Sequence, residues 1–122
     1  MPPPSALENF EKLLAAGKDS ALLRFSLGNE HLKAGNAPRA AEHLACAVAF
    51  DPDFTAAWKL YAKALTAAGR QAEALAAYSA GIAVAGKRGD KQAEKEMRVF
   101  LRRLQATGSA ADSGSDSEAE KQ

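Results

Sequence analysis

Apolar residues recur along this chain three and four positions apart, which is the spacing of one face of an α-helix and not of a strand. In the first such segment the apolar positions are Leu7, Phe10, Leu13 and Leu14. Ser5 precedes them as a favoured N-cap, Glu8 completes a capping-box pattern, and Gly17 ends the segment. The chain therefore opens with an amphipathic helix.

The same alternation of apolar stripes and breaks continues to about residue 105. Gly35-Asn36, Asp51-Pro52-Asp53, Gly69-Arg70 and the loop 86–89 interrupt the periodic segments. The predicted helices cover about 6–16, 20–34, 37–50, 54–68, 71–84 and 91–105. Valine and isoleucine never alternate with polar residues over a strand length, so we predict an all-α fold.

Two stretches 34 residues apart share one sequence frame. The first contains Arg24, Leu27, Gly28, His31, Ala40, Leu44 and Pro52, and the second contains Trp58, Tyr61, Ala62, Leu65, Ala74 and Tyr78. This period and these slots resemble the tetratricopeptide repeat (TPR), W-x2-L-G-x2-Y…A-x3-F…P. Arg24 stands where the family has an aromatic residue, and His31 where it has tyrosine.

The resemblance implies a TPR-like right-handed stack of antiparallel helix hairpins. Ala6 and Phe10 match the Ala-x3-Phe slots, so the first helix is expected to be half a repeat; the alternative is any amphipathic N-terminal helix. Two full repeats and a C-terminal capping helix would follow, and the capping helix has the polar outer face that a stacked array needs. Trp58 is expected to be the largest buried aromatic residue.

Composition divides the chain into three parts. Residues 1–4 contain three prolines and are expected to form an extended leader, and residues 5–105 form the helical domain. Residues 106–122 are rich in serine, glycine, alanine and acidic residues, without a large apolar side chain. We expect them to form a disordered acidic tail, because they cannot bury enough surface to offset the entropy of ordering.

The sequence offers little for catalysis. His43 and Cys46, three residues apart on one predicted helix, are only two ligands for a metal. We expect Cys46 to pack as a small apolar residue, His43 to be solvated and His31 to fill a packing slot. No phosphate-binding loop, HExxH or GxSxG pattern occurs. The prediction is a protein that is not an enzyme and has neither cofactor nor metal.

Charge is concentrated at the end of the chain. Residues 87–105 hold seven basic and three acidic side chains, whereas the tail is acidic. In TPR proteins the first helix of each repeat lines a concave groove that receives a peptide or helix of a partner. The resemblance places the following residues at this peptide-binding groove: Phe25, Asn29, Lys33, Lys59, Lys63, Arg98 and Arg102. Lys59 and Lys63 are i, i+4 neighbours, so their ammonium groups share a helix face.

We therefore expect a protein–protein interaction adaptor that binds an acidic or carboxyl-terminal segment of a partner. The alternative is a self-associating module whose repeat ends pack against another copy. For the oligomeric state we expect a monomer or a weak homodimer. The basic helix lacks interleaved aromatic residues, which argues against nucleic acid. One cysteine, no signal peptide and no membrane-length apolar run favour a cytoplasmic protein.

Overall fold

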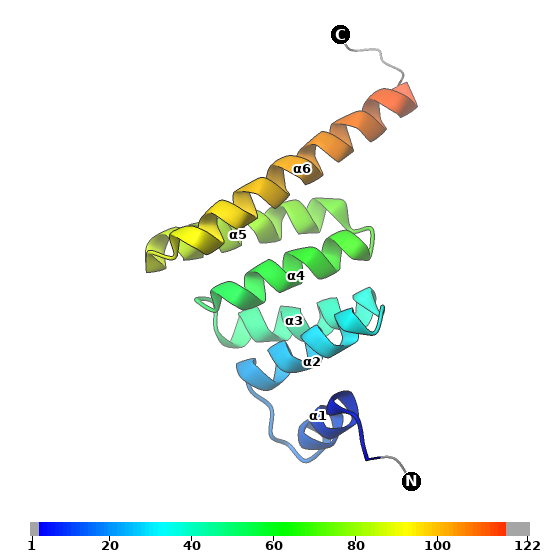
Figure 1. Cartoon of the computed structure of the whole chain (residues 1–122), viewed down its shortest axis with the longest axis vertical. Helices are drawn as coiled ribbons and strands as arrows, with labels where there is room; N and C mark the ends of the chain where they lie inside the picture. Colours follow the sequence, from blue (N-terminus) through cyan, green and yellow to red (C-terminus); the bar gives the residue numbers. More distant parts are fainter. Residues whose placement is uncertain (1–2, 117–122) are drawn as a thin grey trace.

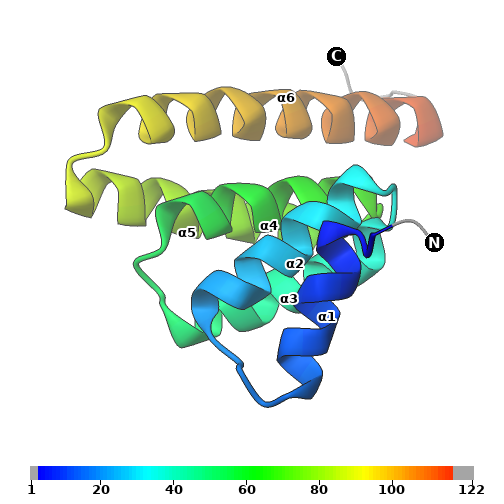
Figure 2. The same cartoon turned by 60° about the horizontal axis from the view of Figure 1, so that its bottom comes forward.

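The computed structural model describes residues 3–116, with side chains to Thr107. Within these residues the chain is all-α, as predicted, and its helices stack in sequence order from one end of the molecule to the other (Figure 1). The helices are α1 (Ala6–Ala15), α2 (Ala21–Lys33), α3 (Ala37–Phe50), α4 (Thr55–Ala67), α5 (Gln71–Arg88) and α6 (Lys91–Asp116). The pairs α2–α3 and α4–α5 are helical hairpins, and α6 runs along the α4–α5 hairpin (Figure 2).

Side-chain caps start three of the helices where the sequence predicts them. The capping box of α1 is formed: Ser5 Oγ accepts from the Glu8 amide at 3.1 Å, and Glu8 Oε1 accepts from the Ser5 amide at 2.8 Å. Ser20 Oγ caps α2 by accepting from the Leu23 amide at 3.0 Å. Asp90 Oδ1 accepts from the Ala93 amide at 3.0 Å, which starts α6.

The core lies between the hairpins. Leu27, Leu44, Leu65 and Met97 are fully buried, one each from α2, α3, α4 and α6. Small residues allow the helices to approach: Gly81 on α5 is covered by Met97, and a Cβ there would lie 2.6 Å from the Met97 sulfur. Met97 thereby connects the last helix to the second hairpin.

Two helices are longer than predicted. Helix α5 continues through Gly86 to Arg88 and ends at Gly89, whose φ of 74° supplies the left-handed C-cap. Helix α6 continues past residue 105 to Asp116, into the segment predicted to be a disordered tail. A lack of large apolar residues does not prevent helix formation, and Ala106, Ala110 and Ala111 are strong helix formers. Residues 117–122 lie outside the described residues.

Trp58 is not the largest buried aromatic residue, contrary to the prediction; among the described side chains that residue is Tyr78. The Trp58 side chain is half-buried, and its indole N–H donates to the Pro52 carbonyl at 2.7 Å. Tyr78 on α5 is only 3% exposed and stacks on Phe100 of α6, with ring centroids 6.0 Å apart. The half-buried position of Trp58 lets its polar N–H meet its acceptor in the connection between α3 and α4. Within residues 3–116, no helix combines the length and apolarity needed to cross a membrane.

Candidate functional site

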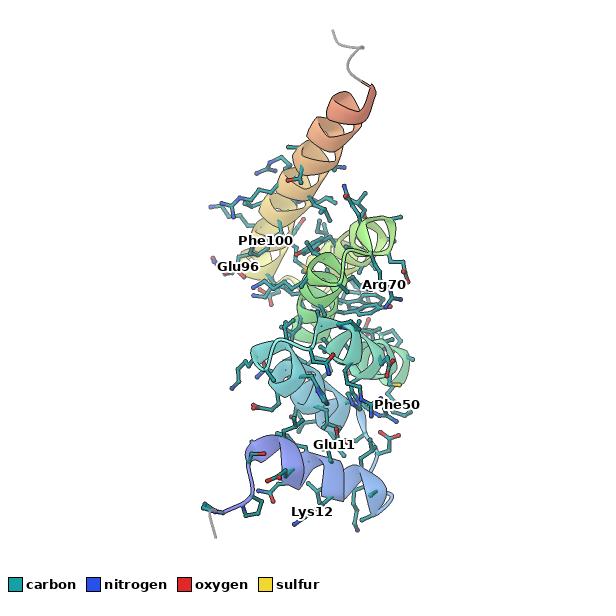
Figure 3. The ribbon with its side chains drawn as sticks, turned by 90° about the vertical axis from the view of Figure 1, so that its right-hand side faces the viewer. Glu11, Lys12, Phe50, Arg70, Glu96 and Phe100 are labelled. Atoms are coloured by element: carbon teal, nitrogen blue, oxygen red, sulfur yellow. The ribbon has the colours of Figure 1, made fainter. Side chains whose placement is uncertain are left out.

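A groove of about 500 Å³ lies between α4 and α6. Its lining residues are Lys59, Lys63, Gln92, Lys95, Glu96, Val99, Phe100 and Arg103. Glu96 and Phe100 project from the same side of α6 (Figure 3). Four of the lining residues are cationic and one is acidic, so the groove is strongly positive.

Helical periodicity aligns these side chains. Lys59 and Lys63 are one turn apart on α4, and Glu96 and Phe100 are one turn apart on α6. The two helices pair in a constant register: Lys59 meets Glu96, 37 residues further on, and Lys63 meets Phe100 at the same offset. The offset exceeds the 34 residues between the first two repeats because α5, with 18 residues, is longer than α3, with 14.

An ion pair and a cation–π contact characterise the groove. Lys59 Nζ lies 2.7 Å from Glu96 Oε1, and Gln92 Nε2 donates to Glu96 Oε2 at 3.1 Å. The hydrogen bond from Lys59, followed by the one from Gln92, holds the pKa of Glu96 below its usual value. Lys63 Nζ lies 4.9 Å from the centroid of the Phe100 ring, and Arg103 Cζ lies 5.9 Å from the same centroid.

The structure brings Lys59 and Lys63 together, as the sequence suggested, but it separates them from the predicted rim. Arg98 Nη2 pairs with Glu94 at 2.9 Å, and neither Arg98 nor Arg102 lines the groove. Lys95 and Arg103 line it instead, because the face of α6 turned toward α4 carries positions 92, 95, 96, 99, 100 and 103. The charge of this helix was visible in the sequence, whereas its rotation was not.

The predicted residues on α2 also lie apart from this groove. Phe25 packs against the core, with its ring centroid 4.9 Å from that of Phe54. Lys33 is exposed and pairs with Glu30 at 3.1 Å, and Asn29 is half-buried. None of the α2 residues lines the space between α4 and α6. Phe25 therefore supports the packing of α2 on α4.

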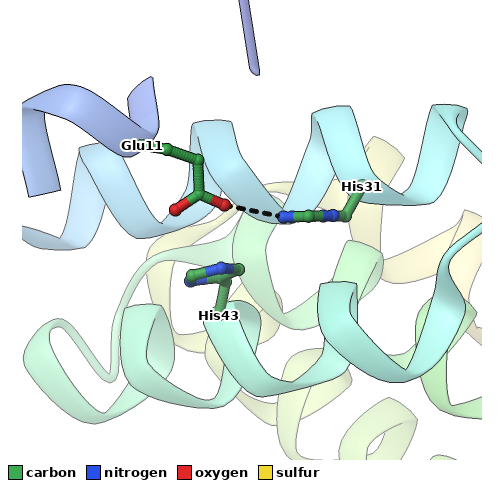
Figure 4. A group of neighbouring side chains, drawn as sticks. All are labelled: Glu11, His31 and His43. Atoms are coloured by element: carbon green, nitrogen blue, oxygen red, sulfur yellow. Dashed lines mark hydrogen bonds and ion pairs between the residues drawn. The ribbon is translucent and has the colours of Figure 1, made fainter. Parts of the chain in front are cut away.

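A second polar cluster joins α1 to the first hairpin. It consists of Glu11, His31 and His43 (Figure 4). One atom of each side chain that could bind a metal, a carboxylate oxygen or an imidazole nitrogen, lies within 4.8 Å of the other two. His31 Nε2 lies 3.1 Å from Glu11 Oε2, and the two imidazoles stack with centroids 5.3 Å apart. His43 is only 1% exposed, so the prediction that it is solvated is wrong. Glu11 and His31 lie 20 residues apart, so sequence spacing could not reveal the group.

The chemistry of His43 argues against a metal at this cluster. Arg24 Nη1 lies 3.2 Å from His43 Nδ1, and a guanidinium can only donate, so Nδ1 accepts and the proton is on Nε2. Arg24 is fixed by Asp19, whose oxygens lie 2.8 and 2.9 Å from Nε and Nη2. His43 therefore presents no free lone pair for a metal while Arg24 stays in place, and we assign the cluster to the attachment of α1.

Stacked helical hairpins with a groove along one face define the class: an α-helical repeat protein. The Bacterial transcriptional activator domain model matches residues 12–105. The chain is 57% identical over 98 residues to a TPR repeat-containing protein of Pseudomonas aeruginosa, covering 80% of this chain and 93% of the relative. The chain belongs to the tetratricopeptide-repeat family, whose fold is generally a protein-interaction module.

Solved structures agree with this assignment. A protein from Bordetella parapertussis is 38% identical, with a TM-score of 0.74 over 93% of this chain and 95% of that one. The crystal structure of a tetratricopeptide repeat domain protein from Salinibacter ruber is 27% identical, with a TM-score of 0.66 over 72% of this chain and 98% of that one. Relatives of this family are typically not enzymes.

Proposed function

We propose that the protein is a non-catalytic adaptor that binds an acidic segment of a partner protein in the groove between α4 and α6. The observation that carries the proposal is the arrangement of cations around an aromatic floor. Lys63 and Arg103 flank the Phe100 ring, and Lys59 and Lys95 line the same groove. Alternating positive charge and apolar surface suits a peptide that presents carboxylates beside apolar side chains.

Each charged contact in such a groove should contribute only modestly to the free energy of binding. Lys59 is about one-third exposed, with 32% of its side chain accessible, so solvent and salt screen its charge. Each lysine should therefore add little by itself, and affinity should fall as salt rises. The Phe100 ring and Val99 supply the apolar contact that salt does not weaken. Carboxyl-terminal and internal acidic segments share the same recognition chemistry.

The test is a charge reversal of the two groove lysines. A fluorescein-labelled peptide of alternating aspartate and leucine, with a free or an amidated carboxyl terminus, serves as the probe in fluorescence anisotropy. We expect Lys59→Glu with Lys63→Glu to abolish binding while the helical circular dichroism spectrum is retained. Lys12→Glu with Lys18→Glu is the matched control, because it makes the same change in charge on exposed residues outside the groove. Equal binding by the two double variants would place the site elsewhere.

The α2 residues that the sequence analysis assigned to the groove could only extend the binding face beyond the α4–α6 groove. Asn29→Ala with Lys33→Ala should weaken a long acidic peptide more than a short one if the ligand continues from α4 across α2. No effect on either peptide confines the ligand to the α4–α6 groove. Arg98→Ala with Arg102→Ala should leave binding of the short peptide unchanged, because neither residue lines this groove.

Sedimentation equilibrium separates the adaptor from a self-associating module. The adaptor proposal expects a monomer or a weak homodimer. The dissociation constant for the peptide probe should then be the same at every protein concentration tested. A stable dimer that loses probe binding on assembly would favour self-association through the repeat ends. The adaptor is proposed to act in the cytoplasm, in keeping with a single thiol, Cys46, that has no partner in the chain.

A further inference from the structure

We infer that Glu96 occupies the carboxylate subsite of the groove and acts as an internal competitor that an acidic ligand displaces. This inference rests on the proposed function. Lys59 and Gln92 are then the hydrogen-bond donors for one carboxylate of the ligand. Glu96 lowers the affinity for that ligand, because the ligand must first displace it.

The geometry of Glu96 is that of a bound carboxylate. Each oxygen is taken by a different donor of the groove: Oε1 by Lys59 Nζ at 2.7 Å and Oε2 by Gln92 Nε2 at 3.1 Å. Charge-assisted hydrogen bonds of this length are stronger than neutral ones. A ligand carboxylate that binds at Lys59 takes the same two donors, so it and Glu96 compete for one position.

The other cations of the groove are differently placed. Lys59 forms an ion pair with a carboxylate. No ion pair of this kind is formed by Lys63, Lys95 or Arg103 with any side chain that the structure describes, that is, up to residue 107. Within the described side chains, three cations of the groove are thus unpaired and available to a ligand, whereas Lys59 is already ion-paired with Glu96. The side chain of Glu96 is 39% exposed, so it can rotate into solvent when a ligand takes its place. Its lowered pKa keeps it ionised, and therefore competing, at neutral pH.

A purely structural role for the pair predicts something different. Lys59 and Glu96 join α4 to α6, and in a purely structural role the ion pair would serve only to hold the last helix. Replacing Glu96 would then lower stability and weaken binding or leave it unchanged. Competition predicts the opposite sign for binding, since the replacement frees Lys59.

The experiment measures binding of the fluorescein-labelled aspartate–leucine peptide to Glu96→Gln, with Glu94→Gln as the matched control. Glu94 lies on the same helix and pairs with Arg98 away from the groove, so both variants remove one negative charge from α6. We expect E96Q to bind about threefold to fivefold more tightly than the wild type at low salt, and E94Q to change binding much less. The gain should disappear in the double variant Lys59→Gln with Glu96→Gln.

The outcomes separate this inference from the proposed function. If the wild type binds and the double reversal of Lys59 and Lys63 abolishes binding, but E96Q binds no more tightly than E94Q, competition by Glu96 is wrong and the groove stands. Weaker binding by E96Q has the same meaning and assigns Glu96 to helix attachment. If neither the wild type nor E96Q binds the peptide, the proposed function and this inference are both overturned.

Discussion

Gly28 on α2 lies directly against Leu44 on α3, so closely that a Cβ at position 28 would overlap the Leu44 side chain. Leu44 is fully buried and cannot move into solvent. We expect Gly28→Ala to destabilise the fold by about 1–3 kcal/mol through overpacking. Thermal and urea unfolding followed by circular dichroism would measure the change.

Gly86→Ala is the matched control for this substitution. Gly86 also lies within a helix, but a Cβ there would be 3.8 Å from its nearest neighbour, the Glu94 carboxylate, which is an ordinary contact. Alanine should therefore stabilise α5 by about 0.5–1 kcal/mol through its higher helix propensity. A Gly28→Ala variant as stable as Gly86→Ala would contradict the tight packing between the helices of the first hairpin.

Tyr78 should matter more to stability than Trp58. Tyr78 is 3% exposed and touches the last helix through Phe100, whereas Trp58 is half-buried. We expect Tyr78→Ala to lower the free energy of unfolding by roughly 3–5 kcal/mol and Trp58→Ala by about 2 kcal/mol. Urea denaturation followed by far-ultraviolet circular dichroism suits both variants, and the reverse order of effects would contradict the burial described above.

Buried His43 should make stability depend on pH. Burial, and then the charge of Arg39, lower its pKa below the ordinary 6.5, while Glu11 opposes and Arg24 and His31 reinforce the shift. A lowered folded-state pKa means that the unfolded chain binds the proton first as pH falls below about 6.5. The stabilisation from neutral His43 is thus present above that pH and is lost progressively as pH falls toward the folded-state pKa.

We expect His43→Gln to reduce the loss of stability between pH 7.5 and pH 5. Urea unfolding of wild type and variant at both pH values measures the difference, and His31→Gln serves as the comparison because His31 pairs with Glu11 on the same cluster. A variant whose pH dependence equals that of the wild type would show that His43 titrates normally in the folded protein.

The last helix should be needed only to about Thr107. Leu104 is 9% exposed, and its carbonyl accepts from Gln71 Nε2 at 3.3 Å, so it is the last described side chain in the core. A chain ending at residue 107 should melt within about 2 °C of the full chain, whereas one ending at residue 102 should melt roughly 8 °C or more lower. A large drop for the chain ending at residue 107 would show that residues beyond 107 contribute to stability.

Local features of this protein were legible in the sequence because they depend on residues a few positions apart. The capping box of Ser5 and Glu8 and the one-turn spacing of Lys59 and Lys63 involve near neighbours along one helix. The 34-residue frame indicated the stacked hairpins, because a repeated pattern of large and small residues packs in the same way each time it occurs.

The groove between α4 and α6 and the buried polar cluster depended on how distant helices rotate and slide against one another. The greater length of α5 sets a 37-residue offset between α4 and α6, and this register turns Lys95 and Arg103 into the groove in place of Arg98 and Arg102. His43 is buried against His31, on which α1 places Glu11, a contact across 20 residues that no helical period predicts. Periodicity establishes which residues share a face, whereas only packing decides what that face meets.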